Sequence, residues 1–168
     1  WNDRFRDDVR GFLRAEPGLV QAMVQRVQGS PDLMDAPLES VNFLACHDGF
    51  TLHDLVAYND KHNDANGEGG TDGSGSNRSW NSGWEGEDGA PADVLALRRR
   101  RLRDAWCLVM LSHGTPMVQM GDECGRSQCG NNNAYAQDNS VSWFDWQAMD
   151  RGHAAFTTRL VAIRLTHP

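Results

Sequence analysis

The residues most able to do chemistry are His47 and Asp48, which directly follow an apolar run at residues 41–46. An imidazole can donate a hydrogen bond to a neighbouring hydroxyl, and a fixed carboxylate can stabilise positive charge that develops beside it. A second acidic pair, Asp122 and Glu123, follows the next apolar run along the chain. Taken alone, the first pair is more simply explained as a polar cap of a strand. For the second pair, loop hydrogen bonding is at least as good an interpretation.

The sequence has no convincing metal or disulfide pattern. Its four cysteines are scattered, which favours small hydrophobic side chains in a reducing compartment. Cys124 and Cys129 are five positions apart, a poor spacing for zinc. The polar loop at 59–89 has oxygen groups that calcium could use, but residues 64–68 do not follow the EF-hand pattern. We therefore expect no cofactor and no metal, with calcium as the alternative.

Helices and strands must alternate to position these residues. Apolar side chains at helical spacing predict amphipathic helices, and short apolar runs bounded by turn residues predict buried strands. In chain order, the predicted elements are helices at 5–13 and 20–27, a strand at 41–46, helices at 51–58 and 91–111, a strand at 115–120 and a helix at 154–165.

This order of elements predicts βα units and a parallel sheet. Long polar loops at 59–89 and 125–139 follow the predicted strands. Ligands bind beyond the carboxyl ends of the strands in such folds. Two or three strands cannot close an eight-stranded barrel, which typically takes about 250 residues. The 168 residues are therefore either a small open α/β domain or part of a larger one.

Charge and hydropathy exclude several classes of partner. The net charge of −7 disfavours nonspecific nucleic-acid binding. We interpret the four consecutive arginines at 98–101 as the solvated side of the long helix. No apolar run approaches the roughly 20 residues that a membrane-spanning helix needs, and the N-terminus has no signal-peptide pattern. We expect a cytoplasmic protein without membrane or nucleic-acid partners.

An ordered set of sequence blocks resembles the isoamylase and bacterial glycogen-debranching branch of the alpha-amylase superfamily. Residues 41–52 are similar to the His-Asp motif at the end of the seventh barrel strand in that superfamily. A lone His-Asp pair would be weak support, but the resemblance covers nearly the whole chain. The further blocks are Tyr58–Asn63, Asn66–Gly69, Asn77–Asn81, Gly114–Met117, Gly121–Arg126 and Gly130–Asn139.

The resemblance implies an α-1,6-glucosidic hydrolase whose substrate is a branched α-glucan such as glycogen, amylopectin or a limit dextrin. The implied fold is a partial (β/α)8 TIM barrel, roughly strand 6 to helix 8, with long loops after strands 7 and 8. Residues 1–168 would be the C-terminal portion of the catalytic barrel, with 58–90 a long loop on the active-site side. Asp48 corresponds to the carboxylate that stabilises the transition state. The implied substrate-binding residues are His47, Asn133, Tyr135 and Asp138.

Two further carboxyl groups of the implied mechanism are missing. Retaining glycosidases need a nucleophile and a general acid roughly 5 Å apart, and the family's Gly-x-Arg-x-Asp nucleophile block does not occur here. Ala15-Glu16-Pro17 spells the family's acid block, but it ends an amphipathic helix, so we interpret Glu16 as a solvated residue before a helix-breaking proline. We predict a parent protein that debranches with retention and an isolated chain that is inactive.

The alternative hypothesis is a noncatalytic glucan-binding or regulatory remnant of the same barrel. An isolated part of a barrel would expose apolar flanks, so we also expect self-association. We expect Trp143 and Trp146 to pack beneath the barrel rim.

Overall fold

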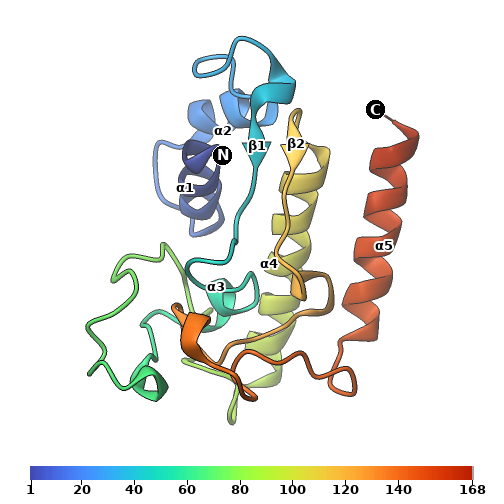
Figure 1. Ribbon diagram of the computed structural model, residues 1–168. Helices are drawn as coiled ribbons and strands as arrows, with labels where there is room; N and C mark the ends of the chain where they lie inside the picture. Colours follow the sequence, from blue (N-terminus) through green and yellow to red (C-terminus); the bar gives the residue numbers. More distant parts are fainter. Residues whose placement is uncertain (168) are drawn as a thin grey trace.

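The computed structural model describes residues 1–167, in which helices surround two short parallel strands (Figure 1). The helices α1 and α2 lie on one side of the strands, and α4 and α5 lie on the other. The elements are α1 (Asp3–Leu13), α2 (Val20–Val27), β1 (Val41–Asn42), α3 (Asp54–Ala57), α4 (Ala92–Leu111), β2 (Thr115–Pro116) and α5 (Arg151–Thr166).

Helix starts follow ordinary capping chemistry. The Asn2 side chain accepts a hydrogen bond from the Phe5 amide at 2.8 Å, which satisfies one of the free amides in the first turn of α1. Asp150 does the same for the His153 amide at the start of α5. The four predicted long helices are confirmed within a few residues at each end, whereas the predicted helix at 51–58 shrinks to the single turn of α3.

The two predicted strands are present and parallel, but each forms a ladder over only two residues. Val41 pairs with Thr115, and Asn42 pairs with Pro116. The predictions of strands over 41–46 and 115–120 were therefore too long. Beyond Asn42 no strand among residues 1–167 pairs with the main chain, and the Leu44 carbonyl accepts from the Arg10 side chain instead. The described residues show two strands, so they show part of a parallel sheet and no closed barrel.

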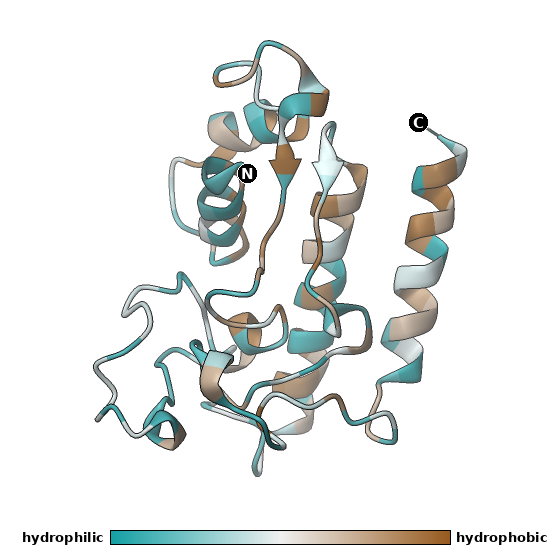
Figure 2. Ribbon diagram, viewed as in Figure 1, coloured by the Kyte–Doolittle hydropathy of each residue, from teal (hydrophilic) through white to brown (hydrophobic). Residues whose placement is uncertain are grey.

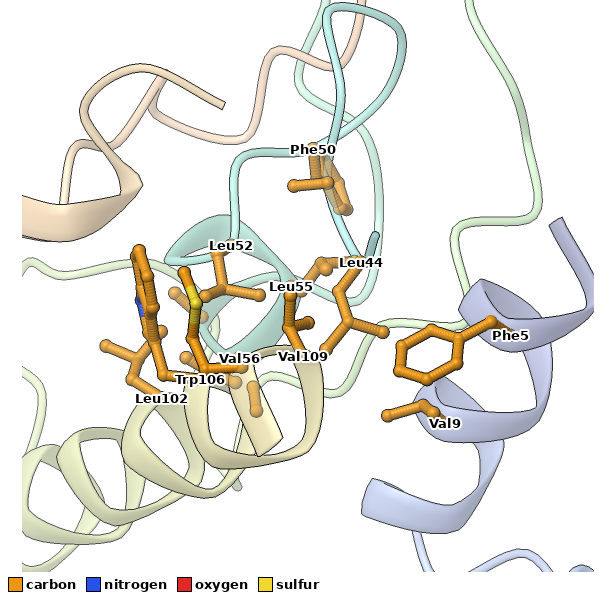
Figure 3. Packing of buried hydrophobic residues seen from close by; sticks show 14 of the residues in the cluster. Phe5, Val9, Leu44, Phe50, Leu52, Leu55, Val56, Leu102, Trp106 and Val109 are labelled. Carbon is orange, nitrogen blue, oxygen red and sulfur yellow. The ribbon is translucent and has the colours of Figure 1, made fainter. Parts of the chain in front are cut away.

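The hydrophobic core lies between α1, the segment after β1, α3 and α4. Figure 3 shows Phe5 and Val9 of α1 facing Leu44. Both α1 side chains are fully buried. Burying a side chain of this size contributes about 1.5–3 kcal/mol, so α1 is fixed firmly against the segment that leads to His47.

Polar loops gather at the end toward which the strands run (Figure 1). The loop from 59 to 89 and the segment from 122 to 139 meet there, joined by hydrogen bonds such as His62 N to Gly130 O at 2.7 Å. The fold therefore places the long loops at the carboxyl ends of the strands, as predicted. Within residues 1–167, no helix is long and apolar enough to cross a membrane.

Candidate functional site

His47 and Asp48 lie at the end of the extended segment that follows β1, and both side chains face solvent. His47 Nε2 is 3.4 Å from an Asp48 carboxylate oxygen, and the two side chains are 73% and 81% exposed. The Trp1 indole packs edge-on against the His47 ring, with ring centres 5.9 Å apart. Trp1 is itself 65% exposed, so an aromatic ring and two polar groups are presented together. No spacing signal in the sequence links Trp1 to His47.

Asp48 lies on the wall of a hollow of about 340 Å³. The Asn132 and Asn133 side chains line the same hollow, so the structure brings two of the predicted site residues, Asp48 and Asn133, together. The remaining lining residues come from α1, from the long loop and, in the case of Gly49, from the segment after β1: Arg6, Asp7, Arg10, Gly49, Gly73, Ser74, Ser76, Asn77 and Arg78.

The other predicted site residues do not line this hollow. Tyr135 is 79% exposed on the short turn at 134–136. The Asp138 carboxylate accepts a hydrogen bond from Trp143 Nε1 at 2.9 Å. Both remain accessible from solvent at the same loop-bearing end of the molecule.

Asn132 fixes the position of the loops around Asp48. Its main-chain oxygen accepts from the Gly49 amide at 3.0 Å, one residue after Asp48. Its side-chain amide donates to Ser74 O at 2.7 Å and to Asn77 Oδ1 at 2.9 Å. The two polar loops and the end of the β1 segment are thus held in one arrangement by a single buried residue, through its side chain and its main-chain oxygen.

Asn133 is held by a carboxylate at the base of the long loop. Its side-chain amide donates to Asp72 Oδ2 at 2.9 Å, and the Asn66 amide donates to the same oxygen at 2.7 Å. These two hydrogen bonds hold the pKa of Asp72 below its usual value. The Asn133 side-chain nitrogen is therefore already hydrogen-bonded to Asp72, although Asn133 also lines the hollow.

Arg10 joins the two sides of the hollow. From α1 it donates to Leu44 O at 2.9 Å and to Asn77 O at 2.8 Å. Burial, together with the neighbouring Arg6, lowers the pKa of Arg10 to about 10, so it stays charged at neutral pH. Arg10 therefore connects the segment that carries His47 and Asp48 to the long loop.

The four arginines at 98–101 do not form a solvated face, which corrects our interpretation. Arg98 is only 1% exposed, and Arg101 lies over the Trp80 ring at 3.9 Å. An α-helix has about 3.6 residues per turn, so four consecutive residues of α4 must cover all of its sides. Of the run, Arg99 and Arg100 are the exposed residues.

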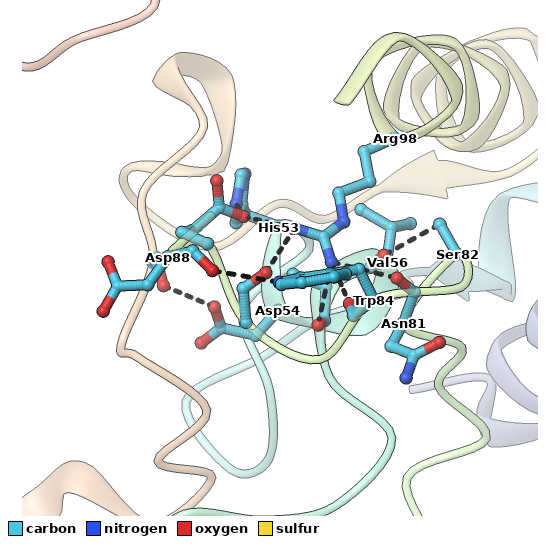
Figure 4. A network of polar contacts seen from close by, with 12 residues as sticks. His53, Asp54, Val56, Asn81, Ser82, Trp84, Asp88 and Arg98 are labelled. Carbon is cyan, nitrogen blue, oxygen red and sulfur yellow. Dashed lines mark hydrogen bonds and ion pairs between the residues drawn. The ribbon is translucent and has the colours of Figure 1, made fainter. Parts of the chain in front are cut away.

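The Arg98 guanidinium organises the end of the long loop (Figure 4). It donates to the main-chain oxygens of Asn81 at 2.9 Å and Gly86 at 2.8 Å, and to Glu87 Oε1 at 2.9 Å. It also donates to the oxygens of Ala57 and Trp84. A loop with few apolar side chains is held by hydrogen bonds to one buried cation.

His53 and Asp54 connect this network to the second polar loop. His53 Nε2 lies 2.8 Å from Glu87 Oε1. Burial alone would lower the pKa of His53, but the Glu87 hydrogen bond and the Asp54 charge outweigh it and raise that pKa. Asp54 accepts from Ser127 Oγ at 2.6 Å and from the Gln128 amide at 2.9 Å, and its burial raises its own pKa.

Asp122 and Glu123 stabilise loops and do not line the hollow. Asp122 is buried beneath the loop after β1, where Oδ1 accepts from the Leu52 amide at 2.9 Å. Burial raises the pKa of Asp122 to about 7. Glu123 accepts from the Gly121 amide at 2.8 Å. Of the two interpretations left open by the sequence, the contacts fit loop hydrogen bonding.

Trp143 and Trp146 are exposed, at 61% and 73%, so the prediction that they pack inward was wrong. Phe144 packs edge-on against Trp146 within the loop that precedes α5. Within residues 1–167, no group of three or more His, Cys, Asp or Glu side chains is arranged to hold a metal ion.

Sequence comparison finds strong similarity to named proteins along the whole chain. The chain is 49% identical to a glycogen operon protein GlgX homolog of Mycobacterium tuberculosis (strain ATCC 25618 / H37Rv), over 99% of this chain and 24% of that protein. It is 45% identical to the chloroplastic isoamylase 3 of Oryza sativa subsp. japonica, over 100% of this chain and 22% of that protein. It is 46% identical to the glycogen debranching enzyme of Salmonella typhi, over 100% of this chain and 26% of that protein.

This segment belongs to the glycogen-debranching and isoamylase group. The resemblance predicted from the ordered sequence blocks is confirmed. No family model matches the chain. The chain spans about a quarter of the length of the glycogen-debranching relatives that it matches.

The fold of this debranching-group segment is also similar to solved pullulanases. The pullulanase from Anoxybacillus sp. LM18-11 matches with a TM-score of 0.69 and 28% identity, over 97% of this chain and 21% of that chain. That enzyme has also been solved in complex with maltotetraose. The pullulanase from Bacillus acidopullulyticus matches with a TM-score of 0.72 and 25% identity, over 99% of this chain and 18% of that chain.

Proposed function

We propose that this chain is part of a debranching glycoside hydrolase that cleaves α-1,6-glucosidic branch linkages with retention. The observation that carries the proposal is the position of Asp48, exposed at the end of the β1 segment and on the wall of the hollow. The relatives matched along the whole chain include enzymes named for glycogen debranching. A cytoplasmic location and the absence of a required metal are parts of the same proposal.

Asp48 is assigned the stabilisation of the transition state. Glycoside cleavage passes through an oxocarbenium-like state with positive charge on the sugar ring. A carboxylate held beside the sugar favours this state over the neutral substrate. The Gly49–Asn132 hydrogen bond at 3.0 Å fixes the main chain next to Asp48, which limits its movement during the reaction.

His47 and three loop residues are assigned substrate contacts. The His47 ring can donate a hydrogen bond to a glucose hydroxyl beside Asp48. Asn133, Tyr135 and Asp138 lie on the loops at the same end of the molecule and offer amide, aromatic and carboxylate groups. The substrate proposed is a branched α-glucan such as glycogen, amylopectin or a limit dextrin, which is in keeping with the maltotetraose bound by a structurally similar pullulanase.

The nucleophile and the general acid are proposed to lie outside these 168 residues. Glu16 is a poor candidate acid, because it follows α1, and its carboxylate is within 3.5 Å of both Arg14 and Arg78. A chain with Asp48 alone cannot complete the double displacement of a retaining glycosidase. We therefore expect hydrolysis only when these residues are joined to the rest of the catalytic barrel.

The proposal is tested by Asp48→Asn in the complete gene product that carries this chain. The expected result is a fall in kcat on amylopectin of about a hundredfold or more, the scale for losing an electrostatic stabiliser, with a much smaller change in KM. Asp60→Asn, at an exposed loop carboxylate, is the matched control. Full activity of Asp48→Asn would contradict the assignment. Glucan binding without hydrolysis by the unmodified gene product would favour the noncatalytic alternative.

A further inference from the structure

Three arginines line the same hollow as Asp48. Arg6 and Arg10 lie one turn apart on α1, and Arg78 comes from the long loop. Among the described residues that line the hollow, the acidic side chains are Asp7 and Asp48. The hollow therefore carries more positive than negative charge, although the chain as a whole has a net charge of −7.

These guanidinium groups have N–H donors to spare. Each guanidinium has about five N–H donors. In the described part of the chain most of those on Arg6 and Arg78 are unused, whereas Arg10 already makes three hydrogen bonds. The Arg6 and Arg78 side chains are 31% and 41% exposed, so a ligand can reach them from solvent. The acceptors that the three groups do use are the carboxylates of Asp7 and Glu16 and the main-chain oxygens of Asp7, Leu44 and Asn77.

This donor set suits a phosphate group better than an unmodified sugar. A neutral glucose ring gains nothing from excess positive charge, whereas a phosphate monoester carries about −1.5 to −2 charges at neutral pH and three strong acceptor oxygens. One guanidinium group can donate two parallel hydrogen bonds to two oxygens of the same phosphate. Asp48 repels an anion placed directly beside it, so the phosphate belongs on the side of the hollow formed by Arg6 and Arg78.

We propose that the hollow beside Asp48 contains a phosphate-binding subsite, formed by Arg6, Arg10 and Arg78, that accepts a phosphate ester on a glucose unit next to the one that Asp48 contacts. This inference rests on the proposed function, because it extends the glucan site to phosphorylated chains. The same donors would hold free inorganic phosphate, which would then act as a competitor.

The test compares phosphate-bearing amylopectin with the same amylopectin after phosphatase treatment, using the complete gene product. We expect kcat/KM to be several-fold higher for the phosphate-bearing chains. Inorganic phosphate should reduce that preference. Arg78→Gln should bring the ratio of the two kcat/KM values close to one and weaken inhibition by inorganic phosphate roughly tenfold, the effect of losing one charge-assisted hydrogen bond.

Arg4→Gln is the matched control, since Arg4 is exposed on α1 and does not line the hollow. It should leave the ratio unchanged. Arg6→Gln provides a second variant if Arg78→Gln does not fold, as judged by its far-UV circular dichroism. Inhibition by inorganic phosphate without preference for phosphate-bearing chains would support the subsite with the free ion as its ligand.

The inference and the proposed function fail in different ways. Equal kcat/KM for the two amylopectins, with no inhibition by inorganic phosphate, would overturn the phosphate subsite and leave debranching intact. If no glucan is cleaved, the proposed function fails, and calorimetric titration of the gene product with inorganic phosphate then decides the subsite. Heat of binding that Arg78→Gln removes and Arg4→Gln retains would support it. Absence of binding would overturn it.

Discussion

The buried Arg98 side chain forms an ion pair with the partly exposed Glu87, in which a guanidinium nitrogen lies 2.9 Å from Glu87 Oε1. The same guanidinium donates to main-chain oxygens along the C-terminal part of the long loop. This part of the loop contributes little to the hydrophobic core. The order of this part of the loop therefore depends on the Arg98 cation, which α4 supplies.

Replacing Arg98 should loosen the long loop and destabilise the chain. Arg98→Gln removes most of the hydrogen-bond donors that the main-chain oxygens around it use, and leaving such groups without partners costs about 1–3 kcal/mol. Arg99→Gln, one residue along and exposed, should change stability by less than about 0.5 kcal/mol. Urea unfolding followed by circular dichroism measures both. Equal midpoints for the two variants would contradict the role given to Arg98.

Glycine should be required at position 73, because the main chain there lies too close to the Asn132 side chain to leave room for a Cβ atom. A Cβ at Gly73 would lie 2.2 Å from Asn132 Oδ1, whereas one at Gly70 would meet nothing within 4 Å. The two glycines have similar positive φ values, +67° and +71°, so alanine imposes a similar backbone strain at both. Gly73→Ala should therefore lower Tm more than Gly70→Ala, and should also weaken glucan binding. Thermal unfolding and glucan affinity electrophoresis test this, and matching behaviour of the two variants would contradict it.

Stability should depend on pH through Asp122. Folding raises the pKa of this carboxyl from an ordinary value of about 3.9 to about 7. Because the folded state holds the proton more tightly, the stabilisation from this group is complete below about pH 4 and is lost as the pH rises through 7. Asp122→Asn should therefore stabilise the chain at pH 8 relative to the unmodified protein, and the gain should disappear near pH 4.

Urea unfolding at pH 4, 6 and 8 measures this effect, with Glu123→Gln as the neighbouring control. The substituted amide keeps an oxygen that can accept from the Leu52 amide, so the comparison isolates the charge. A variant that is less stable than the unmodified chain at pH 8 would contradict the account.

The 168-residue chain should self-associate through an apolar face near the C-terminal end of α5. Figure 2 shows apolar residues there, and Leu38 and Leu165 are each 76% exposed. A hollow of about 340 Å³ near this face is lined by Leu38, Leu111 and Ile163 among others. Leu38→Ser combined with Leu165→Ser should shift the chain toward the monomer in light scattering, whereas Arg99→Gln should not. A monodisperse monomer for the unmodified chain would contradict the prediction.

The sequence predicted the helices better than the contacts that hold them in place. Apolar spacing located α1 and α4, because their burial follows directly from helical periodicity. The strand lengths were overestimated, because ladder formation beyond Asn42 depends on neighbours that apolar runs cannot reveal. The buried role of Arg98 was missed for a similar reason: a run of arginines gives no direct sign of the main-chain oxygens that gather around one of them.

At the candidate site, too, some features could be predicted from the sequence and others could not. The position of Asp48 after a buried segment was predictable from an apolar run followed by polar residues, although the strand itself ends at Asn42. The placement of Trp1 beside His47, and of Arg10 between Leu44 and Asn77, joins residues far apart in sequence. Such contacts depend on the packing of α1 against the β1 segment, which no single-sequence pattern encodes.

The most direct test of the account is reducing-sugar release from amylopectin by the 168-residue chain itself, purified free of host glucosidases, with Asp48→Asn in parallel. The account predicts no release from either protein, because Asp48 is the one carboxylate of the three required by a retaining glycosidase that it assigns to these residues. Release by the unmodified chain that is lost in Asp48→Asn would contradict it, since the nucleophile and the general acid would then have to lie within the chain.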